Sequence, residues 1–196
     1  MSTSPIKFGT SGWRGVIADE FTFANVRLAV TAIAEHVKTK TNQPTILVGY
    51  DTRFFSEEFS QLAVDILQQQ GVRTLLCETF TPTPAVAFEI MRRKLDGAIN
   101  FTASHNPAQY HGLKFSSADA GPALPEVTKD IEARVEKIIE KDGPFPMSPA
   151  VKPPEKDSDS PRSMKKGSSC GRFRNVTSCT PIRRLSSGVR KSPASI

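Results

Sequence analysis

The chain has 196 residues, enough for one domain of ordinary size and a remainder, and its 38% hydrophobic and 23% charged residues are typical of a soluble protein. No apolar run approaches the roughly 20 residues that a membrane helix needs, and the first residues lack the pattern of a secretory signal, so we expect no membrane partner. Three cysteines are too few and too scattered for a disulfide framework, which makes a reducing cytoplasm the expected location.

The net charge of +6 is concentrated in the last part of the sequence. Residues 1–150 carry 15 Lys and Arg against 17 Asp and Glu, a net of −2. Residues 151–196 carry 11 against 3, a net of +8. The body of the chain therefore gives no indication of a nucleic-acid-binding surface.

Strand-like segments alternate with amphipathic helical segments through the body of the chain. The predicted strands are 6–9, 16–18, 45–50, 72–77, 97–101 and 112–116, with a glycine-containing loop at 10–15. The predicted helices are 23–38, capped by Thr22; the segment between Ser56, as its cap, and Gly71; 85–94, capped by Thr83; and 125–141. This alternation predicts an α/β fold, a three-layer α/β/α sandwich with a mainly parallel mixed sheet in which 112–116 pairs antiparallel with its neighbour.

The composition changes after Gly143. Residues 144–155 are rich in proline and are interpreted as a linker between the domain at 1–143 and a tail at 156–196. The tail is rich in Ser, Arg and Lys and has no apolar periodicity, so we predict that it is disordered.

Four segments next to predicted strands carry the groups that suit chemistry. They are 9–15 with Arg14, 51–53 with Asp51 and Arg53, 102–107 with Ser104, and 110–115 with Lys114. Strand ends are where α/β proteins place their sites. A site built from these segments would contain a hydroxyl nucleophile, guanidinium and ammonium groups, an imidazole (His105) and glycine amides, an inventory that suits a phosphoryl group.

Two of these motifs resemble the first domain of the α-D-phosphohexomutases, the phosphoglucomutase/phosphomannomutase superfamily. The motifs are Phe8-Gly9-Thr10-Ser11-Gly12-Trp13-Arg14-Gly15 and Thr102-Ala103-Ser104-His105-Asn106-Pro107. The segments 51–53, 112–114 and 123–127 fit the same family in order, so the resemblance covers about residues 5–142.

The resemblance implies an isomerase of carbohydrate metabolism that acts as an intramolecular phosphotransferase on a hexose phosphate, through a phosphoserine and a hexose bisphosphate intermediate. Ser104 would be the phosphoserine, Arg14 would pair with its phosphate, and Lys114 would assist proton transfer or stabilise charge. His105 and Asn106 would shape the loop, Thr10 and Ser11 would help to bind phosphate, and Asp51 and Arg53 would hold the site together. Mg²⁺ would bind Ser104 through its phosphate, with carboxylates from the family's second domain as its other ligands.

Structural explanations stand beside these roles. Ser104 could lie in a simple turn, Arg14 could be an ion-pair partner, and Lys114 could be a solvated lysine at a strand edge. Trp13 and Cys77 are expected to be packing residues. His36 is expected on a helix surface and His111 in a loop.

The chain departs from the family in length. The family has four domains, and the signatures of the other three are missing. The segment Asp157-Ser158-Asp159-Ser160-Pro161-Arg162 only imitates the metal loop, because Pro161 replaces the third carboxylate. We therefore expect little or no mutase turnover from this chain. A frameshift near residues 158–164 is our hypothesis for the tail, since one reverse translation of 164–171, read one base earlier, encodes an amphipathic helix.

The alternative hypothesis is a non-catalytic protein whose basic tail binds nucleic acid or anionic surfaces. Residues 151–196 combine 11 Lys and Arg with ten serines, but Phe173 is their only aromatic residue, which disfavours base stacking on nucleic acid. The identity of the hexose and the oligomeric state are left open.

Overall fold

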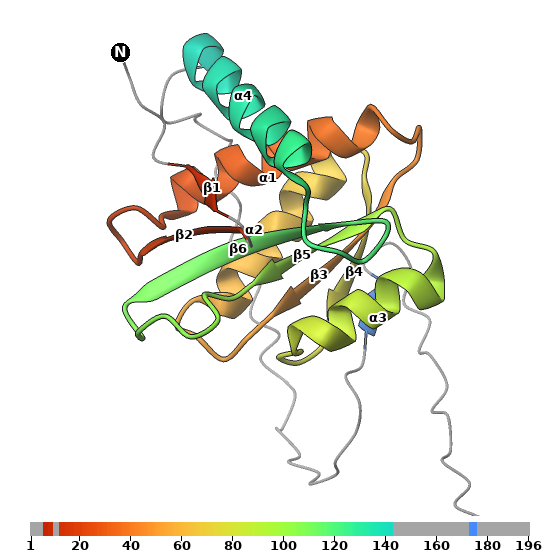
Figure 1. The fold of residues 1–196 in the computed structure, drawn as a ribbon, viewed down its shortest axis with the longest axis horizontal. Coiled ribbons are helices and arrows are strands. Elements are labelled where there is room, and N and C mark those ends of the chain that lie inside the picture. The colour runs from red at the N-terminus through yellow and green to blue at the C-terminus, as the bar shows by residue number, and fades with distance from the viewer. Residues whose placement is uncertain (1–5, 10–11, 143–172, 176–196) are drawn as a thin grey trace, which may run out of the picture.

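Figure 1 shows a twisted sheet with helices on both of its faces. The computed structural model describes residues 6–9, 12–142 and 173–175. The predicted linker, the predicted tail outside 173–175, and the predicted site residues Thr10 and Ser11 lie outside the described residues. In the part that is described, no helix combines the length and the apolar character that crossing a bilayer requires.

Within the described residues the sheet has seven strands, in the order β1-β2-β6-β5-β3-β4-β7. Their bounds are β1 Phe8–Gly9, β2 Gly12–Val16, β3 Thr45–Tyr50, β4 Arg73–Cys77, β5 Gly97–Phe101, β6 Tyr110–Ser117 and β7 Phe173–Asn175. The three central strands β5, β3 and β4 are parallel, and every other pairing is antiparallel.

The helices are α1 Phe23–Lys38, α2 Ser56–Gln69, α3 Thr83–Arg93 and α4 Pro125–Asp142. Helices α2 and α3 both pack on β3 and β5, and Figure 1 shows α3 in front of the sheet and α2 behind it. Helix α1 packs on α2, and α4 packs on α1. Because β3 and β5 are covered on both faces, nearly all of their side chains are buried. The predicted three-layer α/β class is confirmed.

The prediction of a mainly parallel sheet is right only for its centre. Helices α2 and α3 carry the chain back between successive central strands, and such crossovers produce parallel pairs. The connection from β5 to β6 contains no helix, so β6 returns antiparallel to β5 with Asn100 opposite Lys114. The segment 12–16, predicted as loop and the start of a strand, is strand β2, which pairs with β6 through its backbone despite two glycines.

The predicted caps are correct at one helix of three. Thr22 Oγ1 accepts a hydrogen bond from the Asn25 N–H at the start of α1. Helices α2 and α3 begin at Ser56 and Thr83 themselves, after Phe55 and Pro82, and neither N-cap residue has a side-chain capping bond. The two hydroxyl groups make tertiary contacts instead: Ser56 with Asp51 and His111, and Thr83 with Asn100.

Candidate active site

The serine loop, residues 102–107, leaves the buried strand β5 at its carboxyl end. Ser104 is exposed and has a left-handed backbone with φ 58°. This conformation costs a non-glycine residue about 1–2 kcal/mol, so the surrounding structure must hold it. The Ser104 N–H donates to Thr102 Oγ1 over 3.0 Å, and the Asn106 N–H donates to the Ala103 carbonyl over 3.1 Å.

The guanidinium of Arg53 clamps this loop from its carbonyl side. Nη1 donates to the carbonyl oxygens of Pro107 and Tyr110, each over 2.9 Å. Nη2 donates to the carbonyls of Ser104, over 3.0 Å, and Asn106, over 2.6 Å. One side chain therefore holds the loop from Ser104 to its end, and the expectation that Arg53 holds the site together agrees with these contacts.

Arg53 is itself held by Asp51 and two residues behind it. Asp51 Oδ1 accepts from the Arg53 N–H over 2.9 Å, and Oδ2 lies 3.4 Å from Arg53 Nε. Oδ1 also accepts from the Ser56 hydroxyl over 3.0 Å, and Ser56 Oγ lies 3.0 Å from Nε2 of His111. These groups form a continuous hydrogen-bonded path from the core to the serine loop.

The expected positions of the two histidines outside the motif were wrong. His111 lies in strand β6 rather than in a loop and is fully buried, while His36 is almost fully buried against Asp130, with 2.7 Å between Nδ1 and Oδ2. Burial lowers the pKa of His111, and the positive charge of Arg53 acts in the same direction; a Gly112 backbone hydrogen bond and the Asp51 charge oppose this. We therefore treat this imidazole as neutral near pH 7.

Arg14 and Lys114 lie on one face of the sheet beside the serine loop. In the strand register Arg14 is opposite Gly112, and Gly112 precedes Lys114 by two residues, so the three positions share a face. A Cβ on Gly112 would lie 2.6 Å from the Thr102 carbonyl oxygen and 3.1 Å from Arg14 Cγ. A Cβ on Gly12 would lie 3.0 Å from Lys114 Cγ. The glycines thus let both long cationic side chains lie against the strands.

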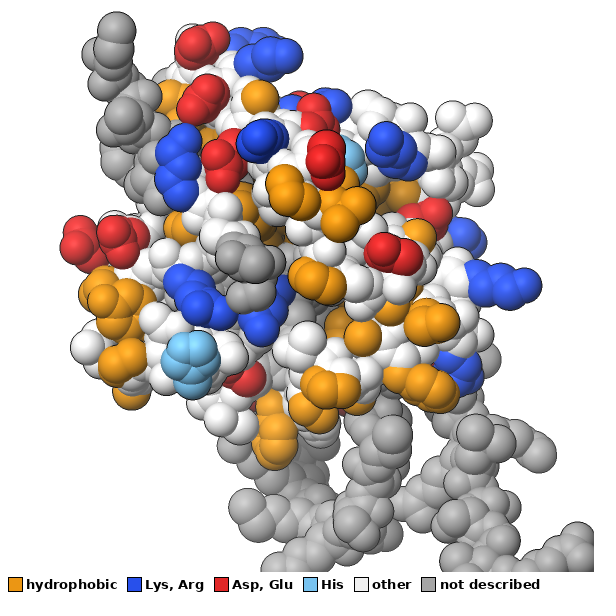
Figure 2. Space-filling model, in the orientation of Figure 1, with side chains coloured by type: hydrophobic (Ala, Val, Ile, Leu, Met, Phe, Trp, Pro, Cys, Tyr) orange, Lys and Arg blue, Asp and Glu red, His pale blue; other side chains and the backbone are white. Residues whose placement is uncertain are grey.

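The closeness of the two cations changes the acidity of the lysine. Burial and then the positive charge of Arg14 lower the pKa of Lys114 from its ordinary 10.5, while Asp51 opposes them. Figure 2 shows Lys and Arg side chains gathered beside a histidine on one part of this face of the molecule. This arrangement favours an anion and makes Lys114 a better proton donor than an ordinary lysine.

The remaining predicted residues occupy different positions in the site. His105 is exposed, next to Ser104. Asn106 is half-buried, and among the described residues its Oδ1 atom is buried without a hydrogen-bond partner. A buried acceptor of this kind is left to be satisfied by a ligand, a water or a residue outside the described part.

Ser56 and His111 belong to this site but were not predicted from the sequence. A signal for His111 was present: His111, Leu113 and Phe115 alternate along one strand, and all three are buried. That period of two places the histidine on the apolar face. Ser56 carried no comparable signal, because a serine near the start of a helix is ordinarily a cap.

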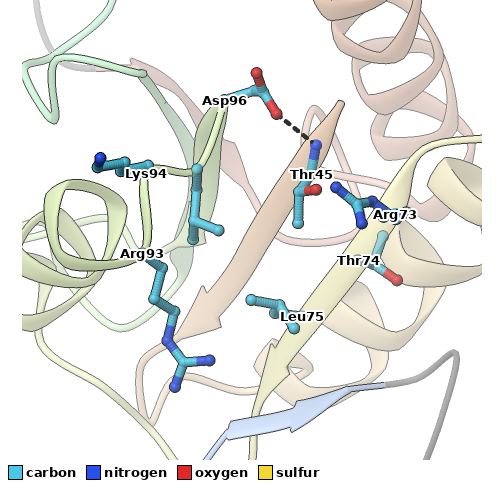
Figure 3. A pocket seen from close by; sticks show the side chains of 8 residues that line it. Thr45, Arg73, Thr74, Leu75, Arg93, Lys94 and Asp96 are labelled. Carbon is cyan, nitrogen blue, oxygen red and sulfur yellow. Dashed lines mark hydrogen bonds between the residues drawn. The ribbon is translucent and has the colours of Figure 1, made fainter. Parts of the chain in front are cut away.

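A cavity of about 470 Å³ lies at the amino-terminal ends of β3 and β4, opposite to the end of the strands that carries the serine loop (Figure 3). It is lined by cations, but Figure 3 shows Lys94 pointing away from Thr45 and Arg93 turned toward β7. Arg93 Nε donates to Glu89 over 2.6 Å, and Asp96 accepts from the Thr45 N–H over 2.7 Å. Because the cations do not converge, we do not assign a site to this cavity.

The part of the chain that the structure describes does not fit a metal ion by itself. It contains no cluster of three or more His, Cys, Asp or Glu side chains in a metal-binding arrangement. Asp51, whose charge acts on both Lys114 and His111, directs its carboxylate to Arg53 and Ser56. A divalent ion at Ser104 would need ligands from elsewhere.

Comparison with known proteins identifies the family. A family model described as phosphoglucomutase/phosphomannomutase, alpha/beta/alpha domain I, matches residues 5–142. The phosphoglucomutase of Staphylococcus aureus strain MRSA252 is 32% identical over 141 residues, which are 69% of this chain and 25% of that protein. The chain thus spans about a quarter of the length of the curated relatives it matches.

Solved structures agree. A candidate phosphomannomutase from Thermus thermophilus superposes with a TM-score of 0.65 and 40% identity over 68% of this chain and 30% of that one. A phosphoglucomutase/phosphomannomutase family protein from Burkholderia thailandensis gives a TM-score of 0.61 at 24% identity over 70% and 31%, which supports the fold alone. Through residues 5–142, this chain belongs to the phosphoglucomutase/phosphomannomutase family, and those residues are its α/β/α domain I.

Proposed function

We propose that residues 5–142 are the phosphoserine domain of a phosphohexomutase, with Ser104 as the residue that carries the phosphoryl group. The observation that carries the proposal is the serine loop itself. It presents an exposed, left-handed Ser104, is fixed from behind by Arg53, and lies next to the Arg14–Lys114 pair. A phosphorylated serine there would have cations to balance its charge and a rigid backbone to aim it.

The reaction class follows from the family resemblance and from these groups. A hydroxyl of the hexose phosphate attacks phosphorus, the bond to Ser104 Oγ breaks, and a bisphosphosugar forms; transfer from its other end restores the phosphoserine. Lys114, with its lowered pKa, exchanges the proton that each transfer moves, and Arg14 binds the phosphoryl oxygens. By the same resemblance, Thr10 and Ser11 would help to bind the phosphate, and His105 and Asn106 would shape the loop around it. The unpartnered Oδ1 of Asn106 described above supports that role.

Members of this family are generally Mg²⁺-dependent. The described residues do not supply a metal site of their own. We propose instead that its carboxylate ligands, and the groups that choose the hexose, belong to parts that the longer relatives have beyond the matched quarter.

We propose accordingly that the chain by itself has little or no turnover. Positioning of both reactants can contribute about 7–11 kcal/mol to catalysis, and this chain would supply only the donor side. The comparisons match residues 5–142 to a phosphohexomutase domain, and they do not favour the alternative of a nucleic-acid-binding protein. A cytoplasmic location remains part of the proposal.

A chimera tests the function in the setting of a full-length relative. Residues 5–142 would replace the matching segment of the Thermus thermophilus protein, and conversion of glucose and mannose 1-phosphates to 6-phosphates would be measured with a hexose bisphosphate activator. We expect turnover that Ser104→Ala reduces by at least about a thousandfold. Mass spectrometry should locate phosphate on Ser104. A folded chimera that is inactive beside an active parent, or an active Ser104→Ala chimera, would contradict the proposal.

A further inference from the structure

The serine loop is connected to a buried pair of residues that the proposed chemistry does not use. His111 is fully buried in β6, and Ser56 is 2% exposed at the start of α2. Neither belongs to the motifs at 8–15 and 102–107. Their side chains contact each other and then Asp51, rather than a substrate-accessible surface.

The hydrogen bonds of this pair take one direction once the tautomer of His111 is assigned. Nδ1 lies 2.8 Å from the Gly112 nitrogen, whose N–H it can accept, and 3.3 Å from the Gly112 carbonyl oxygen, to which it donates in the other tautomer. Because the contact with the N–H is the shorter, we assign the proton of the neutral ring to Nε2. Nε2–H then donates to Ser56 Oγ, and the Ser56 hydroxyl donates to Asp51 Oδ1. Asp51 in turn accepts from the Arg53 backbone and pairs with its guanidinium. The path therefore runs from His111 through Ser56 and Asp51 to Arg53, so the orientation of the Arg53 side chain depends on groups in the core.

Aromatic packing fixes the far end of this path. The His111 ring stacks on Phe21, with centroids 4.9 Å apart and planes at 18°, and meets the edge or face of Phe59 at 5.1 Å and 81°. Phe21 precedes α1 and Phe59 lies in α2, and both are buried. The imidazole therefore cannot turn without disturbing the core.

We infer that Ser56 and His111 are positioning residues: through Asp51 they orient Arg53, and through Arg53 they hold Ser104 in its left-handed, transfer-ready conformation. The inference rests on the proposed function for its catalytic consequence. Its physical part, the rigidity of the serine loop, can be measured separately. Without the hydrogen bond from Ser56, the carboxylate of Asp51 would be held by Arg53 alone and could rotate. The guanidinium of Arg53 would then lose its fixed orientation and some of its hydrogen bonds to the loop carbonyls.

The first measurement is amide hydrogen exchange by NMR in the full chain. Ser104 and Asn106 are the reporters, because both N–H groups are hydrogen-bonded within the loop. Ser56→Ala and His111→Phe should accelerate their exchange about five- to tenfold, the effect of about one net hydrogen bond, while Val48 and Ile99 in the central strands change little. His111→Asn, which keeps a polar group, should restore part of the protection.

Ser60→Ala is the matched control. Ser60 is also buried in α2, and its hydroxyl donates to the Glu57 carbonyl over 2.8 Å without a connection to the loop. It should leave the exchange of Ser104 and Asn106 unchanged. If Ser60→Ala accelerates the loop as much as Ser56→Ala, or if Ser56→Ala and His111→Phe have no effect on it, the inference is overturned.

The second measurement uses the chimera and separates this inference from the proposed function. Ser56→Ala and His111→Phe should lower kcat about five- to tenfold with little change in KM, since they act on the geometry of Ser104 and not on binding of the hexose phosphate. If the chimera without further substitutions is inactive, but Ser56→Ala and His111→Phe accelerate amide exchange in the loop of the full chain, the proposed function is refuted and the positioning is supported. An active chimera whose kcat is unaffected by both variants refutes the positioning.

Discussion

The clamp formed by Arg53 can be tested by its replacement with lysine. Lysine keeps the positive charge but carries it on a single ammonium group, which cannot reach four carbonyl oxygens spread from Ser104 to Tyr110. The side chain of Arg53 is 14% exposed, so the contacts that it loses are only partly replaced by water. The variant therefore isolates the geometry of the guanidinium from its charge.

The size of the effect follows from where the four acceptors lie. The bonds to Pro107 and Ser104 are exposed, so water can take their place, and we count them near zero. The bonds to Tyr110 and Asn106 are half-buried and charge-assisted, worth about 1–1.5 kcal/mol each. Arg53→Lys should thus lower the free energy of unfolding by about 2–3 kcal/mol, which a domain of this size tolerates.

Urea unfolding followed by circular dichroism measures this change. The midpoint should fall with an unchanged m-value, because the buried surface is the same. Arg73→Lys, at an exposed position of β4, provides the control and should shift the free energy of unfolding by less than about 0.5 kcal/mol. An Arg53→Lys variant as stable as its parent would show that the four hydrogen bonds contribute nothing to holding the loop.

Three further predictions concern groups around the same site. Gly112→Ala should destabilise the protein by more than about 2 kcal/mol in the same assay, because the new Cβ would lie 2.6 Å from a carbonyl oxygen. Gly71→Ala is the control: at φ 77° with open space around it, the substitution should cost only about 1 kcal/mol. Similar losses for the two variants would refute the steric argument. The pKa of His111 in the folded state is lowered from 6.5, so the unfolded chain binds that proton more readily, and the free energy of unfolding should fall as pH drops below about 6.5. His111→Phe should make the free energy of unfolding depend less on pH in this range. An unchanged dependence would show that another group causes it. Arg14→Gln should raise the pKa of Lys114 toward 10.5, as followed by NMR of ¹³C-methylated lysines; no movement would mean that burial acts without Arg14.

Hydrophobic patterning predicted the elements whose burial is simplest. Strands Thr45–Tyr50 and Gly97–Phe101 are continuous apolar runs covered on both faces, and their predicted bounds agree with the structure. Strand Gly12–Val16 was not foreseen, because its glycines suggest a loop when local preference is considered alone. Its pairing with β6 is a long-range contact that decides the matter.

The site was predictable where a motif lies directly at a strand end. Ser104, Arg14 and Lys114 were named from sequence, and the structure places Arg14 and Lys114 on one face beside the serine loop. The network behind the loop was not predictable. Ser56 and His111 belong to α2 and β6, 55 residues apart, and only the packing of that helix against the sheet brings them within 3.0 Å.

Strand β7 has a consequence for the solution behaviour of the chain. It pairs with β4 at Leu75, Leu76 and Cys77. Arg73, the first residue of β4, lies outside this pairing and has an exposed side chain. The residues of β7, 173–175, lie outside the segment 5–142 that matches the family. A shortened chain that ends after α4 would therefore bare the outer main-chain groups of β4 along three residues. Such an unpaired edge is a template for another strand, so trimming the protein to its recognisable domain would favour association of one copy with the next.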